Sequence, residues 1–348
     1  MNELESLFFY IIVYLVSAFL LYISKENVLF FFLSVAVVSV LAGLRGNVGT
    51  DYGNYSYMYE QFIDANLLVF VRNFSGSSIG LLFLAKIANL FGGVHVFFGL
   101  IGACVALPAF YYIKLKFRGN DIFIAAFMFL CTVFTSGLNI SKQCVAISFV
   151  ILSSYYVEKN KYVKYFFCIG VAVMFHVTAI CALPIFLMFK KHNKFSILRV
   201  FIVVLVSLSM LFIKKILSFL GGKFEAYIEY DGVVSNRILL LNIAMLVFFF
   251  LLRKQVKKQS SNYDDYLYVF FIGCILLLLG FSSPYIKRIA LYFTSFDFVL
   301  LTLSTRALKE KERFVFRLGA FTYSISLFIL TFFVLGHNDV IPYTFFWM

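Results

Sequence analysis

Several residues that could bind an anion stand where hydrophobic runs of this 348-residue chain begin or end. Lys142, Arg237 and Arg288 lie at or near the starts of such runs, and Arg45 lies at the end of one. Convergence of these cations on one cavity would form an anion site suited to phosphate groups. The alternative for each cation is interfacial snorkelling, in which the long side chain lies along lipid and places its charge among headgroups.

Two titratable side chains are candidates for general acid or base chemistry. Asp51 lies in the segment LRGNVGTDYGNY, whose glycines permit close backbone approach to a ligand. His176 lies in FHVTA with an apolar flank on each side, and an imidazole titrates near neutral pH. Asp51 could instead cap a helix, and His176 could instead satisfy a backbone carbonyl at a helix break.

Tyrosines are dense in the segment DYGNYSYMYEQF, which follows Arg45 in the chain. Tyr52, Tyr55, Tyr57 and Tyr59 could stack against sugar faces. They could equally form the aromatic belt that tyrosines make at membrane interfaces.

The composition tells which elements must position these residues. The chain is 62% hydrophobic and 20% aromatic, with 14% charged residues and a mean hydropathy of +0.94, values that exclude a water-soluble domain. The net charge of +13 does not indicate a nucleic-acid partner, because the basic residues cluster between hydrophobic runs. The six cysteines are scattered singly, which predicts buried apolar side chains with no disulfide and no metal.

The hydrophobic runs predict an all-α, polytopic membrane protein with about ten transmembrane helices. The first run lacks a basic leader and a cleavage site, so we expect a retained helix. The runs long enough to cross a bilayer are residues 4–23, 28–44, 94–113, 121–138, 140–157, 197–213, 237–252, 264–282, 286–304 and 314–335.

Charge between the runs predicts the orientation of a single multi-pass domain over residues 1–348. Cytoplasmic placement of the basic clusters requires both termini outside, which makes 45–78 an external loop. The stretch 163–189 must then return to the side from which it came, and 79–91 must either do the same or lie in the outer interface. For 163–189 we expect two short helices broken at His176, because thirteen residues on each side reach only about 20 Å as helix. Such irregular backbone survives where protein or a water-filled cavity covers it.

Several segments in order resemble the EpsG family, Wzy-like polymerases of bacterial surface polysaccharides. The resemblance covers about residues 41–300, and its most specific parts are the Val-Gly-Thr-Asp-Tyr loop and the Phe-His-x-Thr-Ala break. The segments are LRGNVGTDYGNY, IGLLFLAKIANLF, NISKQCVAISFV, FHVTAI, GKFEAYIEY and KRIALYF.

Two departures from the family pattern concern charged residues. Members usually carry Arg-Gln where this chain has Lys142-Gln143, which keeps the charge but loses the bidentate fork. Many also carry a glutamate just before the short helix, where this chain has serines at 77 and 78. A catalytic role for an acid at that position therefore does not transfer to this chain.

The resemblance implies a GT-C-like fold and a reaction outside the bacterial cytoplasmic (inner) membrane. A glycan carried on polyprenyl (undecaprenyl) diphosphate would be transferred to a lipid-linked repeat unit, giving O-antigen, capsule or exopolysaccharide. We expect no cofactor and no metal, and the resemblance leaves open a partner protein that regulates chain length. Expected roles are catalysis for His176 and Asp51, diphosphate binding for Arg45, Lys142, Arg237 and Arg288, and sugar binding for Tyr52, Tyr55, Gln143 and Tyr292.

Two alternative functions remain at the level of sequence. One is a flippase or transporter of the same lipid-linked sugars, since broken helices and intramembrane charges are also transporter features. We find no inverted or parallel repeat to support it. The other is a related lipid-linked glycan ligase. Asp264-Asp265 looks like a metal-binding pair of nucleotide-sugar transferases, but its place at the start of a hydrophobic run predicts a polar helix start.

Overall fold

The computed structural model describes residues 1–25, 27–66, 78–189, 236–280 and 284–348 of the chain. Within these ranges the regular elements are helices, and an isolated antiparallel bridge joins Arg45 to Phe345. The described residues form two compact units, one of Met1–Ala179 with Glu310–Met348 and one of Ile180–Lys309. The expected single domain stays a prediction.

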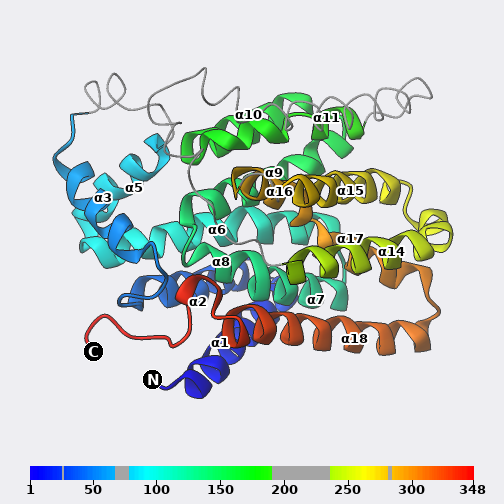
Figure 1. Ribbon diagram of the computed structural model, residues 1–348, viewed down its shortest axis with the longest axis horizontal. Helices are drawn as coiled ribbons and strands as arrows, with labels where there is room; N and C mark the ends of the chain where they lie inside the picture. The colour runs from blue at the N-terminus through cyan, green and yellow to red at the C-terminus, as the bar shows by residue number, and fades with distance from the viewer. Residues whose placement is uncertain (26, 67–77, 190–235, 281–283) are drawn as a thin grey trace. The chain divides into compact units, whose positions relative to one another are not determined.

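The first unit begins with two helices that pack against each other, α1 (Glu3–Ile23) and α2 (Val28–Leu44) (Figure 1). Asn2 starts α1 with a capping box. Its side-chain oxygen accepts from the Glu5 N–H at 2.8 Å, and the Glu5 carboxylate accepts from the Asn2 N–H at 3.0 Å. The capping residues Asn2 and Glu5 therefore determine where the first helix begins.

Helix α6 (Val94–Lys116) packs closely against α2 because small residues lie between them. A Cβ on Gly102 would come within 2.7 Å of the Ala42 Cβ, and one on Gly43 within 2.9 Å of the His95 carbonyl oxygen. Small residues let helices approach where lipid supplies no hydrophobic drive for association.

The rest of this unit's long helices follow in order along the chain. Helix α7 (Asn120–Phe129) continues through a π-helical turn, η1 (Leu130–Phe134), into the short α8 (Thr135–Gly137), and α9 (Ser141–Glu158) follows. Helix α6 packs on both α2 and α9, while α7 packs on α1. The turn between α8 and α9 therefore belongs to the same group of packed helices as the C-terminal end of α2.

The last long helix of this unit is α18 (Glu310–Phe328), which continues into the π-helical η5 (Ile329–Val334). It packs on α7 (Figure 1). At this contact Arg317 donates to the Asp121 carboxylate at 2.7 and 3.0 Å. The ion pair links two helices of this unit that are 196 residues apart in sequence.

Three short helices complete the first unit: α3 (Tyr52–Asp64), α5 (Ile79–Phe91) and α10 (Tyr162–Phe175). Helix α3 packs on α5 and α6, and α10 packs on α5 and α9 (Figure 1). Helix α10 ends at Phe175, His176 is extended with φ −149° and ψ 113°, and the 3₁₀ helix η2 (Val177–Ala182) follows. Whether this broken pair returns to one side of the membrane stays a prediction.

The second unit contains α11 (Ile185–Met188), α14 (Asn236–Gln259), α15 (Tyr263–Leu279), α16 (Pro284–Thr294), α17 (Asp297–Ser304) and the 3₁₀ turn η4 (Thr305–Ala307). The single run expected at 286–304 is thus two helices. Asp264, at the start of α15, accepts from Arg253 at 2.8 and 3.0 Å and from Lys257 at 2.6 Å. These bonds make it part of an ion-pair network between α14 and α15.

Five helical segments of the described chain are long and apolar enough to cross a membrane: Glu3–Ile23, Val94–Lys116, Asn120–Gly137, Arg237–Gln259 and Glu310–Val334. Shorter apolar helices include Val28–Leu44, Ile79–Phe91 and Tyr162–Phe175. The prediction of an all-helical, multi-pass membrane protein is confirmed at this level. The count of ten spans and the GT-C-like arrangement stay predictions, and the expected span 197–213 lies outside the described residues.

Candidate functional site

The loop that follows α2 is built from residues with unusual backbone conformations. Asn47 has φ 53° and Gly49 has φ 92°, both in the left-handed region. A Cβ on Gly46 would come within 2.6 Å of the Phe346 Cα, and one on Gly49 within 2.9 Å of the Leu138 carbonyl oxygen. The glycines of the LRGNVGTDY motif therefore allow two other segments to approach this loop.

One of those segments is the C-terminal segment, residues 336–348. The Gly46 N–H donates to the Thr344 carbonyl at 2.8 Å, and the Phe346 N–H donates to the Leu44 carbonyl at 3.0 Å. Tyr343 connects the segment to α2, because its hydroxyl donates to the Leu41 carbonyl at 2.8 Å. The end of the chain is thus paired with the loop after α2.

Arg45 lies buried between this loop and its neighbours, with 1% of its surface exposed. Its Nη1 donates to the Leu138 carbonyl, and its guanidinium carbon lies 4.5 Å from the centre of the Phe98 ring and 5.8 Å from that of Tyr52. Those two rings are stacked on each other at 4.7 Å. Aromatic faces attract the cation, but they do not neutralise its charge.

The positive charge of Arg45 has no carboxylate within ion-pair distance in the described part of the chain. Its Nε is buried and has no hydrogen-bond partner there. Burial lowers the pKa of Arg45 to about 10, so the side chain stays charged at neutral pH. An unpaired buried charge is costly, and an anion that bound to Arg45 would remove that cost.

Asn139, in the turn between α8 and α9, connects the loop to the C-terminal segment. Its Oδ1 accepts from the Asp51 N–H at 2.7 Å and from the Thr50 hydroxyl at 3.1 Å. Its Nδ2 donates to the Asn338 Oδ1 at 3.1 Å. One buried amide therefore fixes the backbone of Thr50 and Asp51 relative to the start of α9.

Asp51 stands at the N-terminal end of α3, but its carboxylate makes no capping bond to that helix. It accepts from the Asn54 side chain at 3.3 Å and is partly exposed. The capping alternative is therefore not what this structure shows, and the carboxylate faces the surface of the loop.

Lys142 is the second residue of α9, next to this loop. Its N–H donates to the hydroxyl oxygen of Tyr55 at 3.2 Å, and its side chain is partly buried. Tyr55 and Gln143 are both buried. The structure thus brings together five of the predicted site residues through the loop and the α9 start: Arg45, Asp51, Tyr52, Tyr55 and Lys142.

His176 occupies the break after α10. Its N–H donates to the Ala172 carbonyl at 2.9 Å, its carbonyl accepts from the Ala179 N–H at 2.9 Å, and its side chain is partly exposed. The adjacent Phe175 stacks on Phe149 of α9 at 6.4 Å. His176 is therefore joined to the other candidates through α9, with no direct contact established to Arg45.

Three predicted site residues belong to the second unit. Arg237 is exposed in the first turn of α14, Arg288 is exposed in α16, and Tyr292 is buried in α16. Their roles stay predictions.

An open pocket of about 680 Å³ lies beside the Arg45 loop. Tyr52, Asn47 and Asp339 contribute to its wall, as does His95, whose ring stacks on Phe346 at 3.7 Å. Aromatic rings can stack against the face of a sugar, and amide and carboxylate groups can form hydrogen bonds with its hydroxyls.

Sequence reasoning missed Phe98, Asn139 and the C-terminal segment. Phe98 looks like any other apolar residue of its helix. Asn139 and the polar residues of GHNDVIPYT could have been noticed, because both are polar segments that the predicted topology places outside beside the Arg45 loop.

Comparison with known families matches residues 28–345 to the model of the EpsG family, which is nearly the whole chain. No curated protein and no solved structure matches the chain. The family match confirms the resemblance inferred from the motifs.

The Asn139 bonds predict a local loss of stability in Asn139→Ala. Removal of the amide would leave Thr50 and Asp51 groups without a partner, at a cost of about 1–3 kcal/mol. The thermal unfolding midpoint of the purified protein in detergent should fall by several degrees. Asn54→Ala is the matched control, because it removes an exposed amide from the first turn of α3, directly after this loop, and should leave the midpoint unchanged. Equal midpoints for the two variants would contradict the assignment.

Proposed function

Because the chain belongs to the EpsG family, we propose that it polymerises a bacterial surface polysaccharide on the outer side of the cytoplasmic membrane. The family is one of polysaccharide polymerase-like membrane proteins. In this proposal a glycan on a polyprenyl diphosphate carrier is transferred to a second lipid-linked repeat unit. The polymer is an O-antigen, a capsule or an exopolysaccharide.

The observation that carries the proposal is the buried, unpaired charge of Arg45. In the transfer, the acceptor hydroxyl oxygen forms a bond to the anomeric carbon while the bond from that carbon to the diphosphate oxygen breaks. The electron pair leaves with the diphosphate, so negative charge grows there in the transition state. A cation held in a water-poor site stabilises that charge more than water does.

Access of the diphosphate to Arg45 requires a local movement, because the side chain is covered in this state. Tyr52 and the C-terminal segment are the groups that would move aside. Lys142, Arg237 and Arg288 are the further cations proposed for the diphosphate. Cationic side chains would neutralise the leaving group without a metal.

His176 is the proposed base that removes the proton from the acceptor hydroxyl. Asp51 would orient a sugar hydroxyl, since its partly exposed carboxylate lies at the edge of the Arg45 loop. The pocket beside the loop would hold a sugar ring against Tyr52. Tyr55, Gln143 and Tyr292 are buried and stay predictions as sugar contacts.

The direct test is incubation of the purified protein in detergent with a defined lipid-linked repeat unit, followed by mass spectrometry of the products. A polymerase lengthens the glycan without a second compartment, whereas a flippase does not. Arg45→Met should lower the elongation rate by about 100-fold or more. Its unfolding midpoint should be unchanged or raised, because methionine fills the apolar space without a buried charge.

The control for this test is Arg317→Met, which removes a different arginine of the same unit. It removes the two hydrogen bonds from Arg317 to the Asp121 carboxylate, so its midpoint should fall while elongation below that midpoint continues. No elongation by wild-type protein would contradict the proposed function. Wild-type elongation by Arg45→Met would remove Arg45 from it.

The assignment of base and orienting group gives a separate prediction. His176→Ala should lower turnover by about 100-fold or more, as loss of a general base does, while binding of the carrier lipid changes little. Asp51→Asn should weaken both turnover and binding. If His176→Ala kept wild-type turnover and Asp51→Asn abolished turnover with binding intact, the two roles would have to be exchanged.

A further inference from the structure

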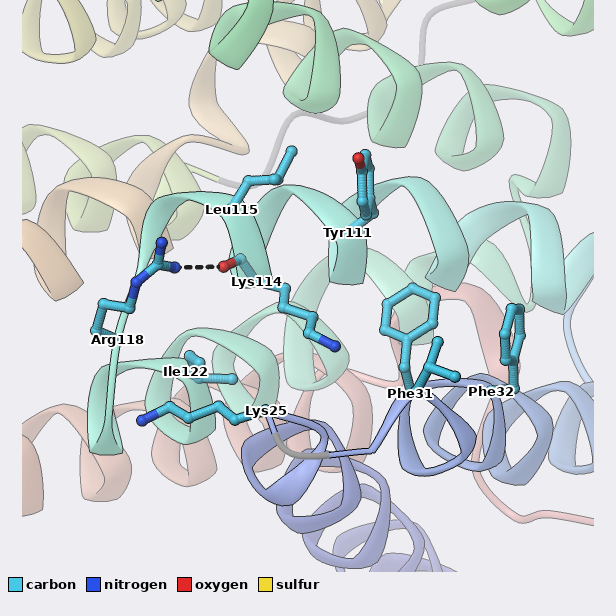
Figure 2. A pocket seen from close by; sticks show the side chains of 9 residues that line it. Lys25, Phe31, Phe32, Tyr111, Lys114, Leu115, Arg118 and Ile122 are labelled. Carbon is cyan, nitrogen blue, oxygen red and sulfur yellow. Dashed lines mark hydrogen bonds between the residues drawn. The ribbon is translucent and has the colours of Figure 1, made fainter.

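A second pocket, of about 600 Å³, lies in the first unit where α1 ends, α2 begins, and α6 passes into α7. Figure 2 shows Lys25, Lys114 and Arg118 at this pocket, with Lys25 from the connection after α1 and the other two from the end of α6 and the residues that follow it. We call these three side chains, with Val28, Phe32 and Tyr111, the basic pocket. It shares no residue with the Arg45 site.

The three cations of the basic pocket have neutral partners. Lys114 Nζ donates to the Ser24 carbonyl at 2.8 Å, and Arg118 Nη1 donates to the Lys114 carbonyl at 2.8 Å (Figure 2). Lys25 Nζ lies 5.9 Å from the centre of the Tyr22 ring. In the described ranges none of the three forms an ion pair with a carboxylate.

Two carboxylates form ion pairs close in sequence to these cations, Asp121 directly and Glu158 through its partner Lys116, and both bind cations outside the basic pocket. Asp121 pairs with Arg317, and Glu158 pairs with Lys116. Glu26 lies outside the described residues, and three cations against this one carboxylate would still leave a net positive charge. The basic pocket is therefore complementary to an anion.

The wall of the basic pocket is apolar and exposed. Val28 is 63% exposed, Phe32 56% and Tyr111 41%, and all three lie on helices of a membrane protein. In a bilayer such side chains contact acyl chains. A soluble anion would bind to the cations but make no contact with the apolar wall. An amphiphile would bind to the cations with its headgroup and cover the apolar wall with its acyl chains.

We propose that the basic pocket binds an anionic glycerophospholipid. Its phosphodiester lies among Lys25, Lys114 and Arg118, and its acyl chains lie along Val28, Phe32 and Tyr111. Arg118 has N–H groups beyond those bonded to backbone carbonyls, and a guanidinium can donate two parallel bonds to phosphate. The topology expected from sequence puts these cations in the cytoplasm, where the leaflet is rich in anionic lipid.

The test compares lipid binding to the full-length protein in detergent by native mass spectrometry. Dioleoyl phosphatidylglycerol should bind more tightly than dioleoyl phosphatidylcholine. Lys25→Gln/Arg118→Gln should weaken the tightest phosphatidylglycerol site by about tenfold or more. This variant keeps Lys114, whose bond to the end of α1 serves the fold, and Arg118→Gln alone is the substitute if the double variant does not fold.

The matched control is Lys161→Gln/Lys254→Gln, which removes two exposed cations from the same predicted side of the membrane. It should change the phosphatidylglycerol affinity less than twofold. Equal affinity of the pocket variant and wild type would overturn the proposal, as would equal binding of the two lipids by wild type. Displacement of the lipid by equimolar glycerol phosphate would also overturn it, because the ligand would then be a soluble phosphate.

Discussion

The buried guanidinium of Arg45 is the constraint that the loop region of the first unit must accommodate. It is charged at neutral pH, covered by protein, and held by one carbonyl and two aromatic faces instead of a carboxylate. Such an arrangement costs stability relative to an apolar side chain of the same volume. The proposed function gives a reason for this cost, because the charge would be needed to bind an anionic ligand.

The same short turn that holds Arg45 also positions its neighbours. The Leu138 carbonyl accepts a hydrogen bond from Arg45, and the Asn139 side chain accepts one from the Asp51 N–H. Lys142 follows in the first turn of α9. Because these residues share one turn, a shift of α9 would move the cation Lys142 and the carboxylate Asp51 together. The C-terminal segment closes the arrangement by pairing with the loop after α2.

Hydropathy located most helices of this chain because a bilayer demands long apolar segments. The short helix at 79–91 was recognised from its apolar residues and from the family resemblance, and it is α5 of the structure. Hydropathy did not reveal the division of 286–304 into α16 and α17, because only Ser295 and Phe296 separate the two helices. Contacts such as Asn139 to Asn338 were invisible for another reason: they join residues that are far apart in sequence, and no local pattern encodes such a pairing. The motif glycines predicted close approach to a ligand, whereas the groups that approach Gly46 and Gly49 in the structure belong to the chain itself, at Phe346 and Leu138.

The central claim is that the charged Arg45 binds the diphosphate of the carrier, and ligand-induced stabilisation tests it most directly. The measurement is the thermal unfolding midpoint of wild-type and Arg45→Met protein in detergent, with a short-chain isoprenyl diphosphate or the corresponding isoprenyl alcohol. A ligand at 100 times its dissociation constant stabilises the folded state by about 2.7 kcal/mol, which is a shift of several degrees. The account predicts that shift for wild type with the diphosphate, none with the alcohol, and a much smaller one for Arg45→Met. Equal diphosphate-induced shifts in the two proteins would contradict it.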